Sequence, residues 1–136
     1  MYIHNTQIRV RYGETDKMGY VYYGNYTEYY EVGRVEALRS VGLEYKSLED
    51  KKGIMMPVIR LSVDYIRPAY YDDLLTIITK IVRLPDQEIN FETEIFNEKN
   101  KLINKAKVDL CCVDMQTMKR VTTPPFIISV LKPYFG

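Results

Sequence analysis

The residues whose types and spacing could support chemistry lie in one stretch, from Arg9 to Tyr26, with Asp16 near its centre. The stretch begins as a strand-like segment, passes through an acidic turn and enters a long predicted helix. Asp16 therefore precedes a helix N-terminus, where the first backbone N–H groups have no acceptor within the helix. A carboxylate placed there can attack a carbonyl, or activate water against it, while those N–H groups polarise the carbonyl oxygen.

A simpler interpretation of Asp16 is structural, because residues 14–19, Glu-Thr-Asp-Lys-Met-Gly, have a typical turn sequence. Aspartate is common in turns since its side chain accepts hydrogen bonds from nearby backbone N–H groups. Glu14 is a second carboxylate two residues away, and two close carboxylates would raise the pKa of one of them. The turn by itself leaves both roles, and both carboxylates, open.

A helix after this turn is predicted from the spacing of apolar residues. From Tyr26 to Val41 they recur at intervals of three and four, and Gly42 fits a C-terminal stop. Asn25 fits an N-cap, and Glu28 three residues later completes a pattern like the capping box. The pattern predicts a helix of about 16 residues, roughly 25 Å long.

Strands are predicted on both sides of this helix, because apolar and polar residues alternate there with a period of two. The predicted strands are 2–12, 59–65, 74–84, 89–95 and 105–112, with a short terminal helix over 126–131. Residues 74–84 are apolar on both faces, which indicates a central strand. Short connections between the last four strands require antiparallel pairing. We therefore predict an α+β fold, an antiparallel sheet of five to six strands around one long central helix.

Composition limits the classes of function. The chain has 136 residues and a net charge of +1, which predicts a single domain over residues 1–136 and no binding to nucleic acid or to an anionic membrane. No apolar run approaches the roughly 20 residues needed to cross a bilayer. The first residues lack a basic region followed by an apolar core, so a secretory signal is not expected. Cys111 and Cys112 are adjacent in a strand, which predicts neither a disulfide framework nor a metal site. The cytoplasm is the expected location.

Tyrosine is unusually frequent, with 13 residues and no tryptophan. Six of these tyrosines lie near Asp16: Tyr20, Tyr22, Tyr23, Tyr26, Tyr29 and Tyr30. A half-buried aromatic seam explains them, since tyrosine can bury its ring while its hydroxyl reaches a partner. The alternative is the wall of a pocket for an aromatic or acyl group.

The run from Tyr12 to Tyr26 resembles the signature of the hotdog-fold acyl-CoA thioesterases, especially the 4-hydroxybenzoyl-CoA thioesterase and YbgC-type group. That signature reads aromatic-x-acidic-x-Asp-x-x-Gly-x-Val-aromatic-Tyr/His-x-Asn/Ser-Tyr. The matching positions include Asp16, Gly19, Val21, Tyr22, Tyr23, Asn25 and Tyr26. Two later segments, 30–34 and 65–73, resemble the family's helix segment and strand-to-turn segment.

The resemblance implies the hotdog fold and hydrolysis of acyl-CoA to free CoA and a carboxylic acid. It assigns Asp16 as the catalytic carboxylate, in preference to Glu14, either as nucleophile or as general base on water. The backbone N–H of Tyr23 or of a close neighbour would stabilise the oxyanion. The remaining matched positions are assigned to substrate binding: Gly19, Val21, Tyr22, Asn25 and Tyr26.

Tyr23 stands where many YbgC-type members carry histidine, and the only histidine, His4, is far away in sequence. Histidine-dependent mechanisms are therefore hard to build here. Arg60 and Arg67 are candidates to reach the CoA phosphates, although surface solubility explains them equally well. The resemblance implies no metal or redox cofactor, because coenzyme A is part of the substrate.

A homodimer or a dimer of dimers is expected, with the active site at the dimer interface, as the resemblance implies. One helix cannot cover both faces of a five-stranded sheet, and residues 74–84 are apolar on both sides. A different class of function is a hotdog module that binds acyl-CoA or acyl carrier protein without turnover. Asp16 argues against that alternative, since a pure binder does not need a carboxylate facing an electrophile.

Overall fold

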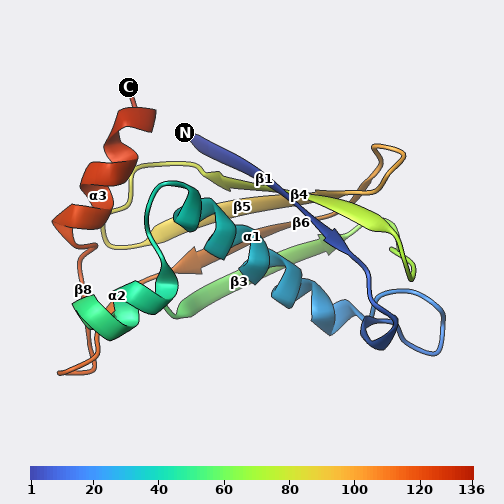
Figure 1. Cartoon of the computed structure of the whole chain (residues 1–136), viewed down its shortest axis with the longest axis horizontal. Helices are drawn as coiled ribbons and strands as arrows, with labels where there is room; N and C mark the ends of the chain where they lie inside the picture. The colour runs from blue at the N-terminus through green and yellow to red at the C-terminus, as the bar shows by residue number, and fades with distance from the viewer.

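The computed structural model describes residues 1–136 and consists of a main antiparallel sheet with one long helix lying along one face (Figure 1). The strands follow the spatial order β1 (Tyr2–Arg9), β4 (Leu74–Ile81), β5 (Ile89–Phe96), β6 (Leu102–Leu110) and β3 (Val58–Tyr65). The long helix is α1 (Tyr26–Ser40). The predicted α+β architecture, with five strands and one long helix, is confirmed.

Smaller elements lie at the ends of the two layers formed by the sheet and α1. They are α2 (Tyr45–Lys52), β2 (Ile54–Met55), β7 (Cys112–Asp114), β8 (Lys119–Val121), α3 (Pro125–Leu131) and three 3-10 turns, Tyr12–Glu14, Tyr23–Asn25 and Lys132–Tyr134. β2, β7 and β8 form a second, three-stranded sheet. None of the helices combines the length and the apolar character that a bilayer crossing would require.

α2 and the short strands were not predicted from the sequence. α2 is a polar helix in which Leu48 is the one buried residue, so it carries no apolar stripe at helical spacing. β2, β7 and β8 have two or three residues each, which is too short for an alternating pattern to stand out.

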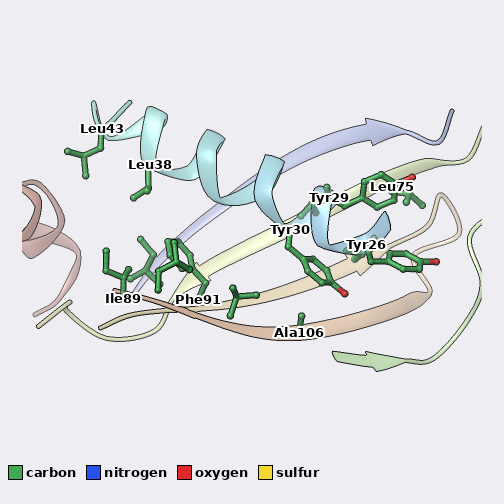
Figure 2. Close-up of a cluster of buried hydrophobic side chains, with 14 of the residues drawn as sticks. Tyr26, Tyr29, Tyr30, Leu38, Leu43, Leu75, Ile89, Phe91 and Ala106 are labelled. Carbon is green, nitrogen blue, oxygen red and sulfur yellow. The ribbon is translucent and has the colours of Figure 1, made fainter. Parts of the chain in front are cut away.

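The core lies between α1 and the sheet (Figure 2). Along β4, burial alternates, so that Leu75, Ile77, Thr79 and Ile81 are buried while the residues between them are partly exposed. β4 lies between β1 and β5, which confirms its predicted place inside the sheet. Tyr30 points from α1 towards the sheet in Figure 2, and its hydroxyl donates a hydrogen bond to Asn104 Oδ1 at 3.0 Å.

α1 begins at Tyr26, as predicted, and Asn25 occupies the N-cap position. Asn25 has helical backbone angles and makes no side-chain capping bond, however, so the predicted capping box does not form. The helical backbone begins earlier, in the 3-10 turn at Tyr23, and the residue before it, Tyr22, is extended at φ −61° and ψ 133°. The first free N–H groups of the helical segment therefore belong to Tyr23 and Gly24.

α1 packs on β1, β4 and β5, and it leaves the far edge of the sheet uncovered. On β3, Leu61 and Tyr65 are 45% and 52% exposed. β3 is also an edge strand, with one side of its backbone unpaired. Apolar side chains and an open backbone edge therefore coincide on β3.

Gly33 lets α1 approach β4 closely. A Cβ atom at Gly33 would lie 2.5 Å from Thr79 Oγ1 and 2.9 Å from Ile77 Cγ2. We expect Gly33→Ala to lower the free energy of unfolding, because overpacking costs about 1–3 kcal/mol and outweighs the gain of about 1 kcal/mol from the helix propensity of alanine. Urea denaturation measures the difference.

Thr79→Ala provides the control. Thr79 Oγ1 is buried without a hydrogen-bond partner, so its removal breaks no bond. In the Thr79→Ala background, Gly33→Ala should lower the free energy of unfolding by less than it does in the wild type, because one of the two clashing atoms is gone. If Gly33→Ala were at least as stable as the wild type, close packing at this position would be disproved.

Candidate active site

Backbone hydrogen bonds fold the segment between β1 and α1 into a tight loop around Asp16. The N–H of Tyr22 donates to the carbonyl of Glu14 at 3.0 Å, and the N–H of Asp16 donates to the carbonyl of Tyr20 at 2.9 Å. The N–H of Gly19 closes the turn on the Asp16 carbonyl at 3.0 Å. Gly19 has φ +90°, a conformation that glycine adopts without strain. The backbone of Asp16 is therefore held on both sides.

The Asp16 carboxylate is only partly engaged. Its Oδ1 accepts a hydrogen bond from the N–H of Met18 at 2.9 Å, while Oδ2 accepts none within the chain. The carboxylate forms no ion pair, and the residue is half-buried. A carboxylate oxygen without a protein partner is free to meet water or an electrophile.

The hydroxyl of Tyr22, the residue before the helical segment, is affected by the charge of Asp16. The pKa of the Tyr22 hydroxyl is raised, chiefly by its hydrogen bond with Tyr23 and in smaller part by the negative charge of Asp16. The start of the helical segment lies next to the Asp16 loop, because the N–H of Tyr22 bonds the Glu14 carbonyl. The N–H groups of Tyr23 and Gly24 have no acceptor within the chain, and they carry the partial positive charge of a helix N-terminus.

A pocket of about 420 Å³ brings these groups together. It is lined by Asp16, Met18, Tyr20, Val21, Tyr23, Tyr26, Tyr65, Ile66, Arg67 and Pro68. The lining is mostly apolar, with one carboxylate and one guanidinium, which is typical of a small-molecule site.

A second hollow, of about 400 Å³, lies on the face of the sheet opposite α1. Its side chains are mainly paired charges, such as Lys80 and Glu94 at 2.7 Å. Ala106 is the single hydrophobic residue of its lining. We read this second hollow as a solvated charged surface, and the Asp16 pocket as the candidate site.

Aromatic contacts fix the wall of the Asp16 pocket. The ring of Tyr65 lies 5.7 Å from that of Tyr26 and 6.3 Å from that of Tyr23, both in edge-on geometry. The Tyr65 hydroxyl also donates to the Tyr23 carbonyl at 3.3 Å. Tyr26 is 3% exposed, and burial raises the pKa of its hydroxyl to about 12, so it is neutral at physiological pH.

The tyrosine cluster thus divides between the two interpretations given by the sequence. Tyr29 and Tyr30 are fully buried in the core, as an aromatic seam requires. Tyr20, Tyr23 and Tyr26 line the pocket. The seam therefore accounts for part of the cluster and a pocket wall for another part, while an aromatic or acyl occupant of that pocket stays a prediction.

Glu14 is placed quite differently from Asp16. Glu14 is 7% exposed, and both of its carboxylate oxygens are occupied. Oε1 accepts hydrogen bonds from the N–H of Arg11 at 2.8 Å and from the Tyr29 hydroxyl at 2.9 Å. Oε2 accepts from Nε and Nη2 of Arg11 at 3.2 and 2.9 Å. With its lone pairs committed in this way, Glu14 is poorly suited to act on a substrate.

These contacts set the ionisation of both partners. Burial alone would raise the pKa of the Glu14 carboxyl, but the hydrogen bonds from Arg11 and Tyr29 outweigh it, and the pKa lies below its ordinary value. Burial and the bond to Glu14 raise the pKa of Tyr29 well above its usual range. Glu14 is therefore ionised and Tyr29 is neutral at physiological pH.

The structure places five of the nine sequence-predicted site residues in the pocket lining: Asp16, Val21, Tyr23, Tyr26 and Arg67. Gly19 and Tyr22 belong to the same loop without lining the pocket, and the Asn25 amide donates to the Glu14 carbonyl at 2.8 Å. Arg60 is not brought to the pocket. It forms ion pairs with Glu88 and Asp109 instead.

Other lining residues were not predicted as site residues, among them Met18, Tyr65, Ile66 and Pro68. In the sequence, the segment 65–73 shows only a resemblance to a strand-to-turn segment. Its closeness to the Asp16 loop depends on tertiary contacts, since the N–H of Val21 donates to the Ala69 carbonyl at 2.8 Å. Spacing along the sequence carries no signal for such a contact.

Comparison with known proteins agrees with this geometry. Residues 18–104 match the thioesterase superfamily. The acyl-CoA thioester hydrolase YbgC of Escherichia coli is 34% identical over 125 residues, covering 92% of each chain. A DHNA-CoA thioesterase structure from Staphylococcus aureus has a TM-score of 0.85 at 33% identity, covering 99% of this chain and 85% of that one.

A 4-hydroxybenzoyl-CoA thioesterase complexed with 4-hydroxybenzoyl-CoA shares the fold, with a TM-score of 0.86 at 20% identity over 96% of this chain and 99% of that one. The antiparallel sheet and long helix are therefore the hotdog fold, as predicted. The chain belongs to the thioesterase superfamily.

The state of Glu14 predicts how stability depends on pH. Because the folded pKa of Glu14 is lowered, its ionised form stabilises the fold above the ordinary carboxyl pKa of 4.5, and this contribution disappears as the pH falls through the folded value. We expect Glu14→Gln to reduce the free energy of unfolding at pH 7 by about 1–3 kcal/mol, since it leaves buried donors unpaired.

Urea denaturation across a pH series measures this difference. The gap between wild type and Glu14→Gln should narrow as the pH falls below 4.5. A gap that stays constant, or widens, down to the acid transition would contradict the assigned ionisation of Glu14.

Proposed function

We propose that this chain is an acyl-CoA thioesterase, which hydrolyses acyl-CoA to free CoA and a carboxylic acid. One observation carries the proposal: Asp16 has an unpaired carboxylate oxygen in the same pocket as Tyr23, at the free N–H end of a helix. Membership of the thioesterase superfamily and similarity to the YbgC thioester hydrolase support it.

In the proposed reaction the thioester oxygen would rest against the N–H groups at the start of α1. Negative charge that develops on this oxygen would be stabilised by the N–H of Tyr23 or of Gly24. Removing one such donor in other enzymes lowers the rate by about 10²–10³-fold. The helix start would therefore contribute several kcal/mol to lowering the barrier.

Asp16 would act in one of two ways. As nucleophile, its free oxygen would attack the thioester carbon, the C–S bond would break, and water would then hydrolyse the mixed anhydride. As general base, it would take a proton from water, whose oxygen would attack the same carbon. In both routes CoA leaves as the thiolate, and the proposal includes no further cofactor.

The pocket wall indicates where the substrate would lie. Tyr23, Tyr26 and Tyr65 offer aromatic surface to the acyl group, which favours aromatic or medium-length acyl chains over acetyl. Arg67 is the cation that lines the pocket, and we propose it as the CoA phosphate contact. Arg60 is left out because it is engaged elsewhere.

We further propose that the chain forms a homodimer through the β3 edge, and that two dimers can associate. Tyr65 at the end of β3 lines the pocket together with Tyr23 and Ile66, and all three side chains are exposed. An unpaired apolar edge strand is a ready surface for pairing with another chain. The partner would then cover the pocket from that side.

In solution the protein should have two or four times the monomer mass of 16.0 kDa at micromolar concentration. Leu61→Lys should shift it towards the monomer, because a charge would be buried at the β3 edge. Ile3→Lys on β1, also exposed in the monomer, is the matched control. Sedimentation would disprove β3 pairing if the wild type were monomeric, or if only Ile3→Lys dissociated it.

The alternative function, an acyl-CoA or acyl-carrier-protein binding module, makes a different prediction. Such a module would bind thioesters without releasing a thiol. Detection of free CoA with a thiol reagent, across acetyl-, medium-chain and aromatic acyl-CoAs, separates the two. Release above the uncatalysed rate supports the thioesterase, and its absence with every ester supports the module.

Asp16→Asn tests the catalytic carboxylate. The change keeps the shape of the side chain and removes both the nucleophile and the base, so kcat should fall by at least about 10²-fold while CoA esters still bind. Asp50→Asn, at an exposed position of α2, is the control and should keep full activity. Near-full activity of Asp16→Asn would show that another group does the chemistry.

A further inference from the structure

Glu14 bonds residues on both sides of the proposed site, the loop that carries Asp16 and the start of α1, without lining the pocket. Its side chain bonds Arg11, just after β1, and Tyr29 in α1. Its carbonyl oxygen accepts hydrogen bonds from the Tyr22 N–H at 3.0 Å and from the Asn25 amide at 2.8 Å. Glu14 is thus two residues from Asp16 on one side, and bonded to the residue before Tyr23 on the other.

A purely stabilising ion pair does not account for this arrangement. The Arg11 side chain is 76% exposed, and exposed ion pairs contribute little to stability. Burying a carboxylate is costly unless its lone pairs are satisfied. Here the four hydrogen bonds to that carboxylate join the end of β1 to α1, across the base of the Asp16 loop.

We propose that Glu14 is a positioning residue: with Tyr29 it sets the distance between the Asp16 carboxylate and the N–H groups at the start of α1. The inference rests on the proposed catalytic role of Asp16. Glu14 acts through Asp16 and takes no part in bond making. Losing the network lets the loop shift relative to the helix, which separates the carboxylate from the polarised carbonyl.

Two variants test this role. Glu14→Gln keeps the size of the side chain but replaces an acceptor with a donor, facing Arg11 and Tyr29, which are donors themselves. Tyr29→Phe removes only the hydroxyl, and it carries the test if Glu14→Gln fails to fold. Matched controls are Glu28→Gln, an exposed carboxylate in the first turn of α1, and Tyr45→Phe, whose hydroxyl has no partner.

Each variant is measured for kcat and KM with Asp16 present and again in the Asp16→Asn background. With Asp16 present, Glu14→Gln and Tyr29→Phe should lower kcat by about tenfold, within the 10²-fold that a 1 Å misplacement can cause. KM should change by less than about threefold. In the Asp16→Asn background, the same two changes should alter the residual kcat by less than about twofold, because the effects of residues that act as a unit are not additive. The two controls should leave all values unchanged.

An equal loss of kcat in both backgrounds would overturn the proposal, because Glu14 would then act independently of Asp16. Unchanged kcat with Asp16 present, or an effect on KM alone, would overturn it as well. Failure of the proposed function is seen separately, since Asp16→Asn alone would then keep its activity. If Asp16→Asn is impaired while Glu14→Gln and Tyr29→Phe have no effect, only the positioning role is lost.

Discussion

The buried Glu14 carboxylate is the constraint on which the site depends. A carboxylate removed from water has to be satisfied by donors within the fold, and Glu14 takes its donors from Arg11 and from Tyr29. Meeting that requirement brings the end of β1 against the first turn of α1. The loop between β1 and α1 is therefore forced into a sharp turn, and Asp16 lies in that turn. The same ionised group, stabilised by these hydrogen bonds, thereby shapes the Asp16 loop.

Coverage of the sheet by a single helix explains where the pocket opens. α1 lies over β1, β4 and β5 and begins beside the end of β3, where Tyr65 meets Tyr23 and Tyr26. The pocket is therefore walled by the helix start on one side and by an uncovered edge strand on the other. Substrate binding and chain association would share this boundary, which couples them through the same apolar residues.

Local sequence patterns predicted the elements that carry a strong period. α1 and the long strands followed from apolar spacing, and the Asp16 turn followed from a contiguous motif. Elements without a periodic apolar face were not predicted. α2 is an example, because it has a single buried residue. The start of α1 was predicted correctly, but the capping bond expected of Asn25 does not form, because its amide donates to the Glu14 carbonyl instead.

The pocket residues that are distant from Asp16 in sequence could not be predicted from residue spacing. Tyr65 joins the pocket because its hydroxyl bonds the Tyr23 carbonyl, a contact between residues 42 positions apart in the sequence. Arg60 was predicted as a contact of the CoA phosphates but lies away from the pocket, paired with Glu88 and Asp109. The sequence shows that the residue is basic, but not which side of the sheet its side chain occupies. Glu14 was judged a competitor of Asp16, and its burial with four hydrogen bonds became visible only in three dimensions.

A crystal structure of the Asp16→Asn variant with benzoyl-CoA tests the central claim most directly. The account predicts that the thioester oxygen lies about 2.7–3.1 Å from the N–H of Tyr23 or Gly24, the range expected for an oxyanion site. It also predicts the thioester carbon next to the side chain at position 16, with the benzoyl ring against Tyr26 and Tyr65. A thioester bound away from the start of α1, with those N–H groups facing solvent, would contradict it.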